Sequence, residues 1–311
     1  MYLLGSLLPV FLIIALGKIL CRTGFFSDGL AKSLNRLTYW IALPALLIDK
    51  ISNAAFNSGD VTRMSLLLVL ATAGSVAVGY IAAFALRLNR RSMGAFVQGA
   101  MRSNNAFIGL PVILYSMTGS DPGIMALATV ALAPSIVFYN FLSVLILLAH
   151  GDRQQRSPGA AVLLFIKQLL LNPLLIACVI GLLLNSCEIA LPVAVQRTLT
   201  ALGDTALALA LLSIGASLSF QGLRTGLVPS TVSSGIKVFI QPLIGLGLAM
   251  LWKLPPAERQ ILLIYLACPT AVASYVMADI FNSDRDLAAH IVVVSTLLSG
   301  LSLAAVLVLG G

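Results

Sequence analysis

"RSNNAFIGLPVI", residues 102–113, places an arginine, two asparagines, a glycine and a proline inside a stretch that is otherwise apolar enough to cross a membrane. Polar and helix-breaking residues at one depth of a membrane helix are costly unless they face protein or a water-filled cavity. If the rest of the chain lies in lipid, this stretch therefore predicts an interrupted helix beside a functional cavity.

The composition of the chain indicates that it does lie in a membrane. Its 311 residues are 59% hydrophobic and only 10% charged, whereas a soluble domain has about 25% charged residues. The formal net charge of +8 does not indicate a nucleic-acid partner, because the basic residues fall in short loops and not on one amphipathic face. We therefore expect an integral membrane protein that is surrounded by lipid and binds no nucleic acid.

The sequence has no pattern that would hold a metal or a cofactor. The cysteines form no CxxC pair and have no histidine at metal-ligand spacing. There is no phosphate-binding glycine run, and none of the Ser/His, Asp-pair or HExxH arrangements that an intramembrane enzyme would need. The sequence thus predicts a protein that is not an enzyme and that uses no metal, cofactor or ATP.

Apolar runs of about 18 residues or more mark membrane spans, and ten such runs follow one another along this chain. We expect an all-α integral membrane protein whose transmembrane helices cover approximately residues 2–20, 33–51, 64–86, 93–117, 122–148, 160–185, 192–219, 226–252, 259–281 and 287–309.

The hydrophilic stretch at 150–159 divides these spans into two sets of five. Because five is odd, a second half related to the first would enter the membrane from the opposite side. Two matches favour such a relation over chance: "PVFLIIALG" begins at Pro9 and "PLLIACVIG" at Pro173, and in each second span a leucine precedes "ALL" at the same distance. We predict a first five-helix repeat (1–149), a linker (150–159) and an inverted second repeat (160–311).

Basic residues indicate the orientation of the spans. The odd-numbered loops contain eleven Lys and Arg residues, and the even-numbered loops contain five. This bias places the odd-numbered loops in the cytoplasm and both termini outside. The expected location is the cytoplasmic (inner) membrane, with the linker on the cytoplasmic side.

Two helix-breaking points lie at corresponding depths in the two halves. Asn104 and Asn105 are about eleven residues into the fourth span, which is about 17 Å along a helix and near the middle of a hydrocarbon core of about 30 Å. Pro269 and Thr270 are equally far into the ninth span. Paired interrupted helices are typical of carrier binding sites, so we predict that helices four and nine are broken and cross at the midplane. The rival interpretation is a pair of simple kinks, with the amides bonded to a neighbouring helix.

Three ionisable residues lie near the same depth. Lys237, in "SGIKVFIQP", is expensive in lipid without a partner or an anion, and snorkelling is its rival interpretation. Asp204 is a candidate partner of Lys237 or a proton carrier, unless its helix begins later and leaves it in a loop. Arg102, one turn before the break, can hold an anion or pair with a loop carboxylate.

Several of these stretches together resemble a known family. The auxin efflux carrier family, which includes bacterial dicarboxylate carriers and plant PIN proteins, resembles this chain at "RSNNAFIGLP" (102–111), "YWIALPALL" (39–47), "LLSIGASLSF" (211–220), "LACPTA" (266–271) and "STLLS" (295–299). The resemblance covers essentially the whole chain. It implies two inverted five-helix repeats, broken helices four and nine that cross, and a transport part that moves like an elevator against a scaffold.

The resemblance also implies a substrate site at the break. In plant members an asparagine beside the break holds the substrate carboxylate, and Asn104, seven residues before Pro111, takes that place here. Asn105 faces another way on a helix and is expected to matter less. This sequence departs from a two-asparagine pattern at the second break, because Thr270 follows Pro269 where a second amide would stand.

The expected function is a secondary transporter that moves a small organic anion, a carboxylate or dicarboxylate, by an elevator-type alternating-access mechanism. Amides, helix N-termini and basic side chains near the midplane favour a carboxylate over a cation. The expected substrate-binding residues are Asn104, Asn105, Arg102, Pro111, Pro269, Thr270 and Lys237, with Asp204 for proton coupling.

The alternative is a sodium- or proton-coupled symporter or antiporter of related fold with another substrate. A receptor or a channel has less support. The sequence leaves open which anion is carried, whether a proton or sodium ion is coupled, and whether two copies form a homodimer.

The predicted orientation can be tested with a single cysteine introduced near residue 154, within the hydrophilic linker. A membrane-impermeant thiol reagent added to intact cells should not label this cysteine, because the linker is expected in the cytoplasm. Labelling from the periplasmic side would show that the orientation is reversed.

Overall fold

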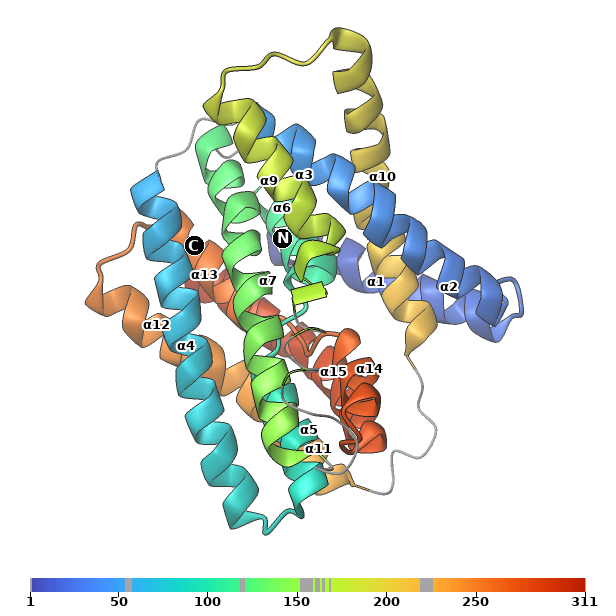
Figure 1. Ribbon diagram of the computed structural model, residues 1–311, viewed down its shortest axis with the longest axis vertical. Helices are drawn as coiled ribbons and strands as arrows, with labels where there is room; N and C mark the ends of the chain where they lie inside the picture. The colour runs from blue at the N-terminus through green and yellow to red at the C-terminus, as the bar shows by residue number, and fades with distance from the viewer. Residues whose placement is uncertain are drawn as a thin grey trace. The chain divides into compact units, whose positions relative to one another are not determined.

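The computed structural model describes residues 2–53, 58–117, 121–151, 159, 163, 166–167, 169–218 and 226–310. Regular structure in these residues is helical (Figure 1). The α-helices are α1 Tyr2–Arg22, α2 Asp28–Leu37, α3 Leu43–Ser52, α4 Ser58–Ala85, α5 Arg90–Met101, α6 Leu110–Ser116, α7 Pro122–His150, α9 Pro173–Ser186, α10 Val193–Ser217, α11 Leu227–Gly235, α12 Gln241–Leu251, α13 Pro256–Ala267, α14 Ala273–Ile280 and α15 Arg285–Gly310. The π-helical turns are η1 Thr38–Ala42, η2 Asn105–Gly109 and η3 Ile236–Ile240.

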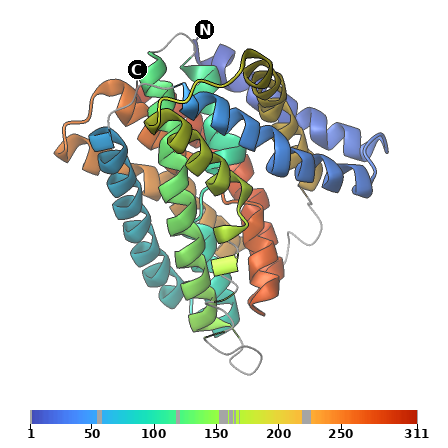
Figure 2. The same ribbon diagram turned by 45° about the horizontal axis from the view of Figure 1, so that its top comes forward.

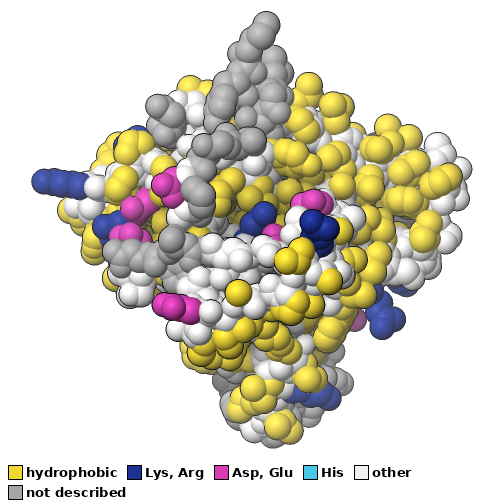
Figure 3. Space-filling view, turned by 90° about the horizontal axis from the view of Figure 1, so that it is seen from above, with side chains coloured by type: hydrophobic (Ala, Val, Ile, Leu, Met, Phe, Trp, Pro, Cys, Tyr) yellow, Lys and Arg dark blue, Asp and Glu magenta, His cyan; other side chains and the backbone are white. Residues whose placement is uncertain are grey.

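The lengths and the surfaces of these helices suit a lipid bilayer. Among the described residues, five helices are long and apolar enough to cross a membrane: Ser58–Ala85, Gly123–His150, Val193–Ser217, Leu227–Leu251 and Arg285–Val308. Large hydrophobic side chains such as Leu12, Ile81 and Leu183 are exposed, and hydrophobic side chains cover most of the face seen in Figure 3. Soluble proteins rarely expose such large apolar patches. The prediction of an all-helical membrane protein is thus confirmed, while the count of ten spans stays a prediction.

A proline follows each π-helical turn at one fixed distance. Pro44, Pro111 and Pro242 each stand two residues after the last residue of a turn. A proline has no N–H for the carbonyl four residues earlier, and its ring pushes that carbonyl aside, so the wider π turn relieves the clash. At Pro242 the released carbonyl is that of Val238, and it accepts a hydrogen bond from the Ser302 hydroxyl.

The chain forms two compact units. Unit 1 consists of Met1–Arg63, Ala106–Pro134 and Gln168–Leu218, and unit 2 consists of Met64–Asn105, Ser135–Lys167 and Ser219–Gly311. Each unit contains segments from both halves of the sequence, so the units are not the predicted repeats. The division into repeats stays a prediction, and the predicted linker at 150–159 lies largely outside the described residues.

In unit 1, α1 packs against α10, as both ribbon views show (Figures 1 and 2). Glycines allow the two backbones to approach closely. A Cβ atom on Gly17 would overlap the carbonyl of Leu212, and one on Gly215 would overlap the carbonyl of Ile14. Each helix therefore contributes a glycine at the point where it meets the other.

A second pair in unit 1 repeats this arrangement, because α9 packs against α3. A Cβ atom on Gly181 would lie 2.8 Å from Cβ of Ile51. Gly181 ends the motif "PLLIACVIG" as Gly17 ends "PVFLIIALG". In both pairs, the first helix of one sequence half packs on the second span of the other half, with the motif glycine at the contact.

In unit 2, α15 packs against α5, α11, α13 and α14. Serine hydroxyls of α11 join these helices: Ser233 donates to the carbonyl of Phe96 at 2.8 Å, and Ser234 donates to the carbonyl of Ile291 at 3.2 Å. This packing buries the last turns of α5 and α13 completely. The two predicted break points therefore begin inside the core of unit 2.

Replacing Gly215 by alanine should lower the stability of the folded protein. The new Cβ would overlap the Ile14 carbonyl, and overpacking of this kind costs about 1–3 kcal/mol, more than the gain of about 1 kcal/mol from Gly→Ala in a helix. Gly247→Ala in α12 is the matched control, because a Cβ there meets no neighbouring helix within 4 Å. Thermal unfolding in detergent measures both variants, and an equal Tm would contradict the close α1–α10 contact.

Candidate functional site

The helix breaks, where the chain leaves α5 and α13 without helical hydrogen bonds, lie side by side in unit 2. Ser103 and Thr270 form an antiparallel bridge between them. Two backbone hydrogen bonds flank this bridge, from the N–H of Asn104 to the carbonyl of Pro269 (2.9 Å) and from the N–H of Ala271 to the carbonyl of Arg102 (3.0 Å). Each interrupted segment thus supplies backbone partners that the other needs. The structure brings the two predicted break points together.

Neutral side chains satisfy the last carbonyls of α5. In a continuous helix each carbonyl accepts from the N–H four residues later, and the break ends that ladder. The carbonyl of Gly99 accepts from Thr270 Oγ1 at 2.8 Å, and the carbonyl of Ala100 accepts from Ser75 Oγ at 2.6 Å. The side chain of Gln241 donates to the next carbonyl, that of the last residue of α5, at 3.3 Å.

The end of α13 uses a charged side chain instead. In a continuous helix, the Leu266 carbonyl would accept from the N–H of Thr270, but that N–H donates to Ser295 Oγ at 3.0 Å. The Leu266 carbonyl accepts from Lys237 Nζ at 2.7 Å. Lys237 lies in η3 and is fully buried. The prediction that Lys237 points inward is therefore confirmed, and its observed partner is a backbone carbonyl.

Arg102 is a second buried cation at the breaks. Its guanidinium donates to Asn140 Oδ1 at 2.8 Å and to Ser143 Oγ at 3.3 Å, both on α7, and also to the sulfur of Met277 on α14. These three acceptors are neutral groups, and they orient the guanidinium. Helix α7 is thus one of the elements that position the cation next to the break.

Unsatisfied polar atoms gather at the first break. The Tyr139 hydroxyl, the Ser103 hydroxyl and both amide atoms of Asn105 are buried and have no hydrogen-bond partner among the described residues. The Tyr139 hydroxyl lies beside the side chains of Ser103, Thr72 and Asn105, although none of them reaches hydrogen-bond geometry with it. A buried polar group without a partner costs about 1–3 kcal/mol. Four such atoms in one place therefore indicate a site for a polar ligand or for ordered water.

Tyr139 was not among the predicted site residues. Its signal in the sequence is weak, although its neighbour Asn140 is the only amide in the fifth predicted span. In the structure both residues face the break, Tyr139 beside Ser103 and Asn140 in contact with Arg102. Polar residues spaced along one face of that span were the available clue.

The other predicted site residues divide between the two units. Asn104 is buried in unit 2, where its N–H takes part in the pairing of the breaks. Pro111 lies in the first turn of α6 in unit 1, and Asp204 is exposed on α10 of the same unit. A contact between Asp204 and Lys237 would join the two units and stays a prediction.

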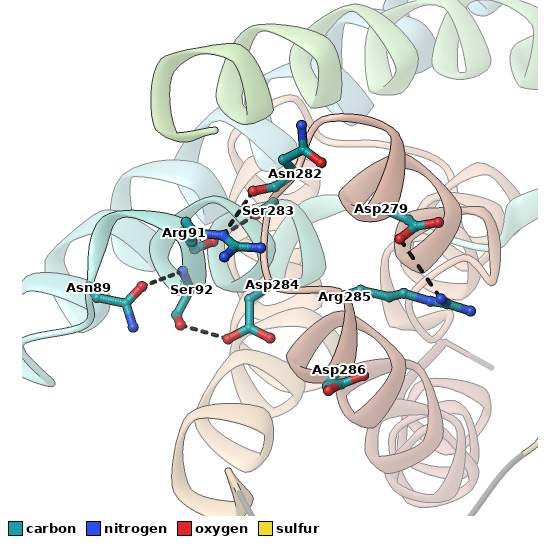
Figure 4. A pocket seen from close by; sticks show the side chains of 9 residues that line it. All are labelled: Asn89, Arg91, Ser92, Asp279, Asn282, Ser283, Asp284, Arg285 and Asp286. Carbon is teal, nitrogen blue, oxygen red and sulfur yellow. Dashed lines mark hydrogen bonds and ion pairs between the residues drawn. The ribbon is translucent and has the colours of Figure 1, made fainter. Parts of the chain in front are cut away.

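A polar pocket of about 440 Å³ lies in unit 2 between the start of α5 and the turn from α14 to α15 (Figure 4). Two contacts connect its walls: Ser92 Oγ donates to the Asp284 carboxylate (2.6 Å), and Arg91 Nε donates to the carbonyl of Asn282 (3.0 Å). On the α14–α15 side, Arg285 lies 3.8 Å from Asp279. None of the predicted site residues lines this pocket. Because these polar groups bond to one another, we interpret them as contacts that hold α5 against the α14–α15 turn, and not as a ligand site.

In the part of the chain that the structure describes, no three His, Cys, Asp or Glu side chains are grouped to hold a metal ion. Four cysteines are free thiols: Cys21, Cys178, Cys187 and Cys268. The side chains described at the breaks offer hydroxyls, amides, two cations and the buried thiol of Cys268, the C-cap residue of α13.

Interrupted helices that bond to each other inside an all-helical membrane protein, beside unsatisfied polar atoms, are typical of membrane transporters. The comparison with known families agrees with this class. The family model described as "membrane transport protein" matches residues 2–307, and the chain belongs to this family, that of the auxin efflux carriers.

Three similar proteins, each named as a transporter, match this chain over nearly their whole length. An uncharacterized transporter of Methanothermobacter thermautotrophicus is 24% identical over 300 residues, which cover 96% of this chain and 95% of that protein. An uncharacterized transporter of Methanocaldococcus jannaschii is 23% identical over 304 residues, with 96% and 95% covered. A proposed malonate transporter of Rhizobium meliloti is 22% identical over 301 residues, with 95% and 92% covered. The resemblance found in the sequence is confirmed, and the chain is a transporter and not an enzyme.

Removing the Tyr139 hydroxyl with Tyr139→Phe should leave the protein as stable as before, or up to about 1 kcal/mol more stable, because a buried hydroxyl without a partner is lost. Ser233→Ala is the matched control. The buried Ser233 hydroxyl donates to the carbonyl of Phe96 at 2.8 Å, so its loss should cost about 1–3 kcal/mol. Thermal unfolding without substrate measures both, and an equal loss in the two variants would show that the Tyr139 hydroxyl has a partner.

Proposed function

We propose that this transporter is a secondary carrier that moves a small organic anion, a carboxylate or dicarboxylate, across the cytoplasmic membrane. The observation that carries the proposal is the group of unsatisfied polar atoms at the paired breaks. A carboxylate would give the hydroxyls of Ser103 and Tyr139 and the amide of Asn105 the partner that they lack. Arg102, the residue before Ser103, adds a buried positive charge that favours an anion.

The proposed binding residues are those around the breaks. The amides of Asn104 and Asn105 and the guanidinium of Arg102 contribute donors, and Tyr139 joins them. The expectation from the sequence put Asn104 first, whereas the unsatisfied amide of Asn105 gives this second asparagine at least equal weight. The remaining proposed residues shape or hold the breaks: Pro111, Pro269, Thr270 and Lys237.

A dicarboxylate is the preferred substrate class within this proposal. The Rhizobium meliloti relative, a proposed malonate transporter, supports it. The ammonium of Lys237 is directed at the Leu266 carbonyl, which leaves Arg102 to face the substrate. A dianion brings more negative charge than Arg102 alone neutralises, so a coupled proton would complete the balance, and Asp204 stays the proposed carrier of that proton. The alternative, a sodium- or proton-coupled carrier of another substrate, is less favoured because no carboxylate is among the side chains described at the breaks.

The proposed mechanism is elevator-type alternating access in a fold of ten spans and two inverted repeats, with both termini outside. Arg102, Asn105, Pro269, Thr270 and Tyr139 belong to one compact unit, while η2 beyond Asn105 and Pro111 belong to the other. A site that travels with one body requires such a common unit for its binding residues. The equivalent α1–α10 and α9–α3 contacts, each with a motif glycine, support the inverted repeat.

Transport by purified protein in liposomes tests the function directly. Labelled malonate, a monocarboxylate and an organic cation of similar size are offered under a fixed pH gradient, with protein-free liposomes as the control. We expect saturable uptake of the dicarboxylate that unlabelled dicarboxylates inhibit. Uptake of the cation without uptake of either carboxylate would contradict the proposal.

Asn104→Ala and Asn105→Ala should each weaken substrate binding by about 5- to 150-fold, the equivalent of about 1–3 kcal/mol for a lost hydrogen bond to a buried acceptor. Asn53→Ala is the control, because this amide is exposed and bonds the backbone carbonyl of Asp49 at the end of α3. The apparent KM for uptake and the Tm are measured for all three. Wild-type KM values in folded Asn104→Ala and Asn105→Ala proteins would exclude both amides from the site.

A further inference from the structure

The broken end of α13 is held by a buried lysine side chain. Lys237 is 0% exposed, and its ammonium donates to the carbonyl of Leu266 at 2.7 Å. A buried ammonium is costly in a membrane protein unless a partner compensates it. Here the partner shown is a backbone carbonyl and not a carboxylate, so the reason for the charge must lie in the helix end itself.

The end of α13 is electrically negative. The last carbonyls of a helix lack donors within the helix and carry the negative end of its dipole. At this end the donors that a continuous helix would supply are diverted: the N–H of Thr270 goes to Ser295, and the N–H of Ala271 goes to the carbonyl of Arg102. The resulting negative potential lies in the buried core of unit 2, where water does not screen it.

The equivalent position in the first half of the chain is neutral. Ser75 bonds the carbonyl of Ala100, the second-last residue of α5, as Lys237 bonds that of the second-last residue of α13. Ser75 and Lys237 also lie equally far into the third spans that the sequence predicts for the two halves, residues 64–86 and 226–252. A hydroxyl therefore suffices to satisfy such a carbonyl, and the lysine supplies a charge in addition to the hydrogen bond.

Carriers with interrupted helices generally use the C-terminal ends of half-helices and unwound carbonyls to coordinate a coupling cation such as Na⁺. A lysine ammonium is a compact monovalent cation on a flexible stem. We propose that Lys237 is a resident cation at the end of α13: a positioning residue that holds the broken helix and makes transport independent of an added monovalent cation. The transport measurement of this proposal rests on the proposed function. The negative charge of the substrate is compensated by Arg102 and not by Lys237.

The test compares Lys237→Ala with wild type in chloride salts of choline, sodium and methylammonium at equal ionic strength. Wild-type uptake of labelled malonate should be the same in all three salts. In choline, the uptake by Lys237→Ala should fall at least about tenfold, because a charged hydrogen bond is lost. Sodium or methylammonium should restore part of it, since alanine leaves room for a small cation.

Two further variants separate the charge from the hydrogen bond. Lys237→Gln keeps a hydrogen-bond donor without a charge, so its uptake in choline should also be impaired. Ser75→Ala, the matched control, loses a hydrogen bond at the equivalent carbonyl, and its uptake should not respond to the cation. A Lys237→Gln protein with wild-type uptake in choline would overturn the proposal.

Thermal unfolding provides a measurement that needs no substrate. Sodium or methylammonium should raise the Tm of Lys237→Ala relative to choline, because a ligand that binds only the folded state stabilises it, and should leave the Tm of wild type and Ser75→Ala unchanged. A wild-type protein that itself requires sodium, or a Lys237→Ala protein that responds to neither cation, contradicts the resident cation. A wild type that carries no organic anion in any salt contradicts only the proposed function. If Lys237→Ala does not fold, the Lys237→Gln result decides.

Discussion

Every backbone carbonyl inside a membrane must have a donor, and this requirement determines the structure around the two breaks. Water is absent from the hydrocarbon core, so an interrupted helix is stable there only if protein groups replace the missing hydrogen bonds. The two breaks meet part of this need by bonding to each other through Ser103 and Thr270. Side chains of neighbouring helices meet most of the remainder, and the need for these donors explains many polar residues in spans that are otherwise apolar.

The hydrogen bonds that each buried polar side chain makes also separate structural residues from candidate ligand-binding residues. Ser75 and Thr270 are buried and polar, but each donates to a carbonyl at the end of α5. Gln241 donates there through its amide nitrogen, while its amide oxygen has no partner among the described residues. Tyr139 and Asn105 are equally buried and have no partner among the described residues. Depth in the membrane does not distinguish the two groups, because both occur at the breaks. Only the hydrogen bonds that each side chain makes reveal which atoms remain for a substrate.

Part of this arrangement could be predicted from the sequence. The adjacent asparagines at 104–105 and the "CPT" at 268–270 stand out because amides and helix breakers are rare at mid-depth in apolar runs. The depth of Lys237 correctly predicted its burial. The class of protein followed from the order and spacing of motifs along the whole chain.

Other parts could not be predicted from the sequence, for physical reasons. The donors for the α5 carbonyls come from helices far away in the chain, so Ser75 and Gln241 carried no local signal. Tyr139 looked like an ordinary aromatic residue of an apolar span, since only tertiary packing shows that its hydroxyl lacks a partner. The partner of Lys237 was expected to be a carboxylate or an anion, and a helix end has no sequence signature of its own. Asp204 lies within an apolar run, and hydropathy does not tell which side of α10 faces outward.

The π-helical turn in the second span determines how that span meets its neighbours. A π turn contains one more residue than an α-helical turn, and one residue corresponds to a rotation of about 100° around the helix axis. Side chains of α3 therefore point in directions different from those that a continuation of α2 would give them. Accordingly, α2 packs against α10, whereas α3 packs against both α9 and α10. The five residues Thr38–Ala42 act as an angular offset, so the insertion or deletion of a single residue there would turn every later side chain of the span toward a different neighbour.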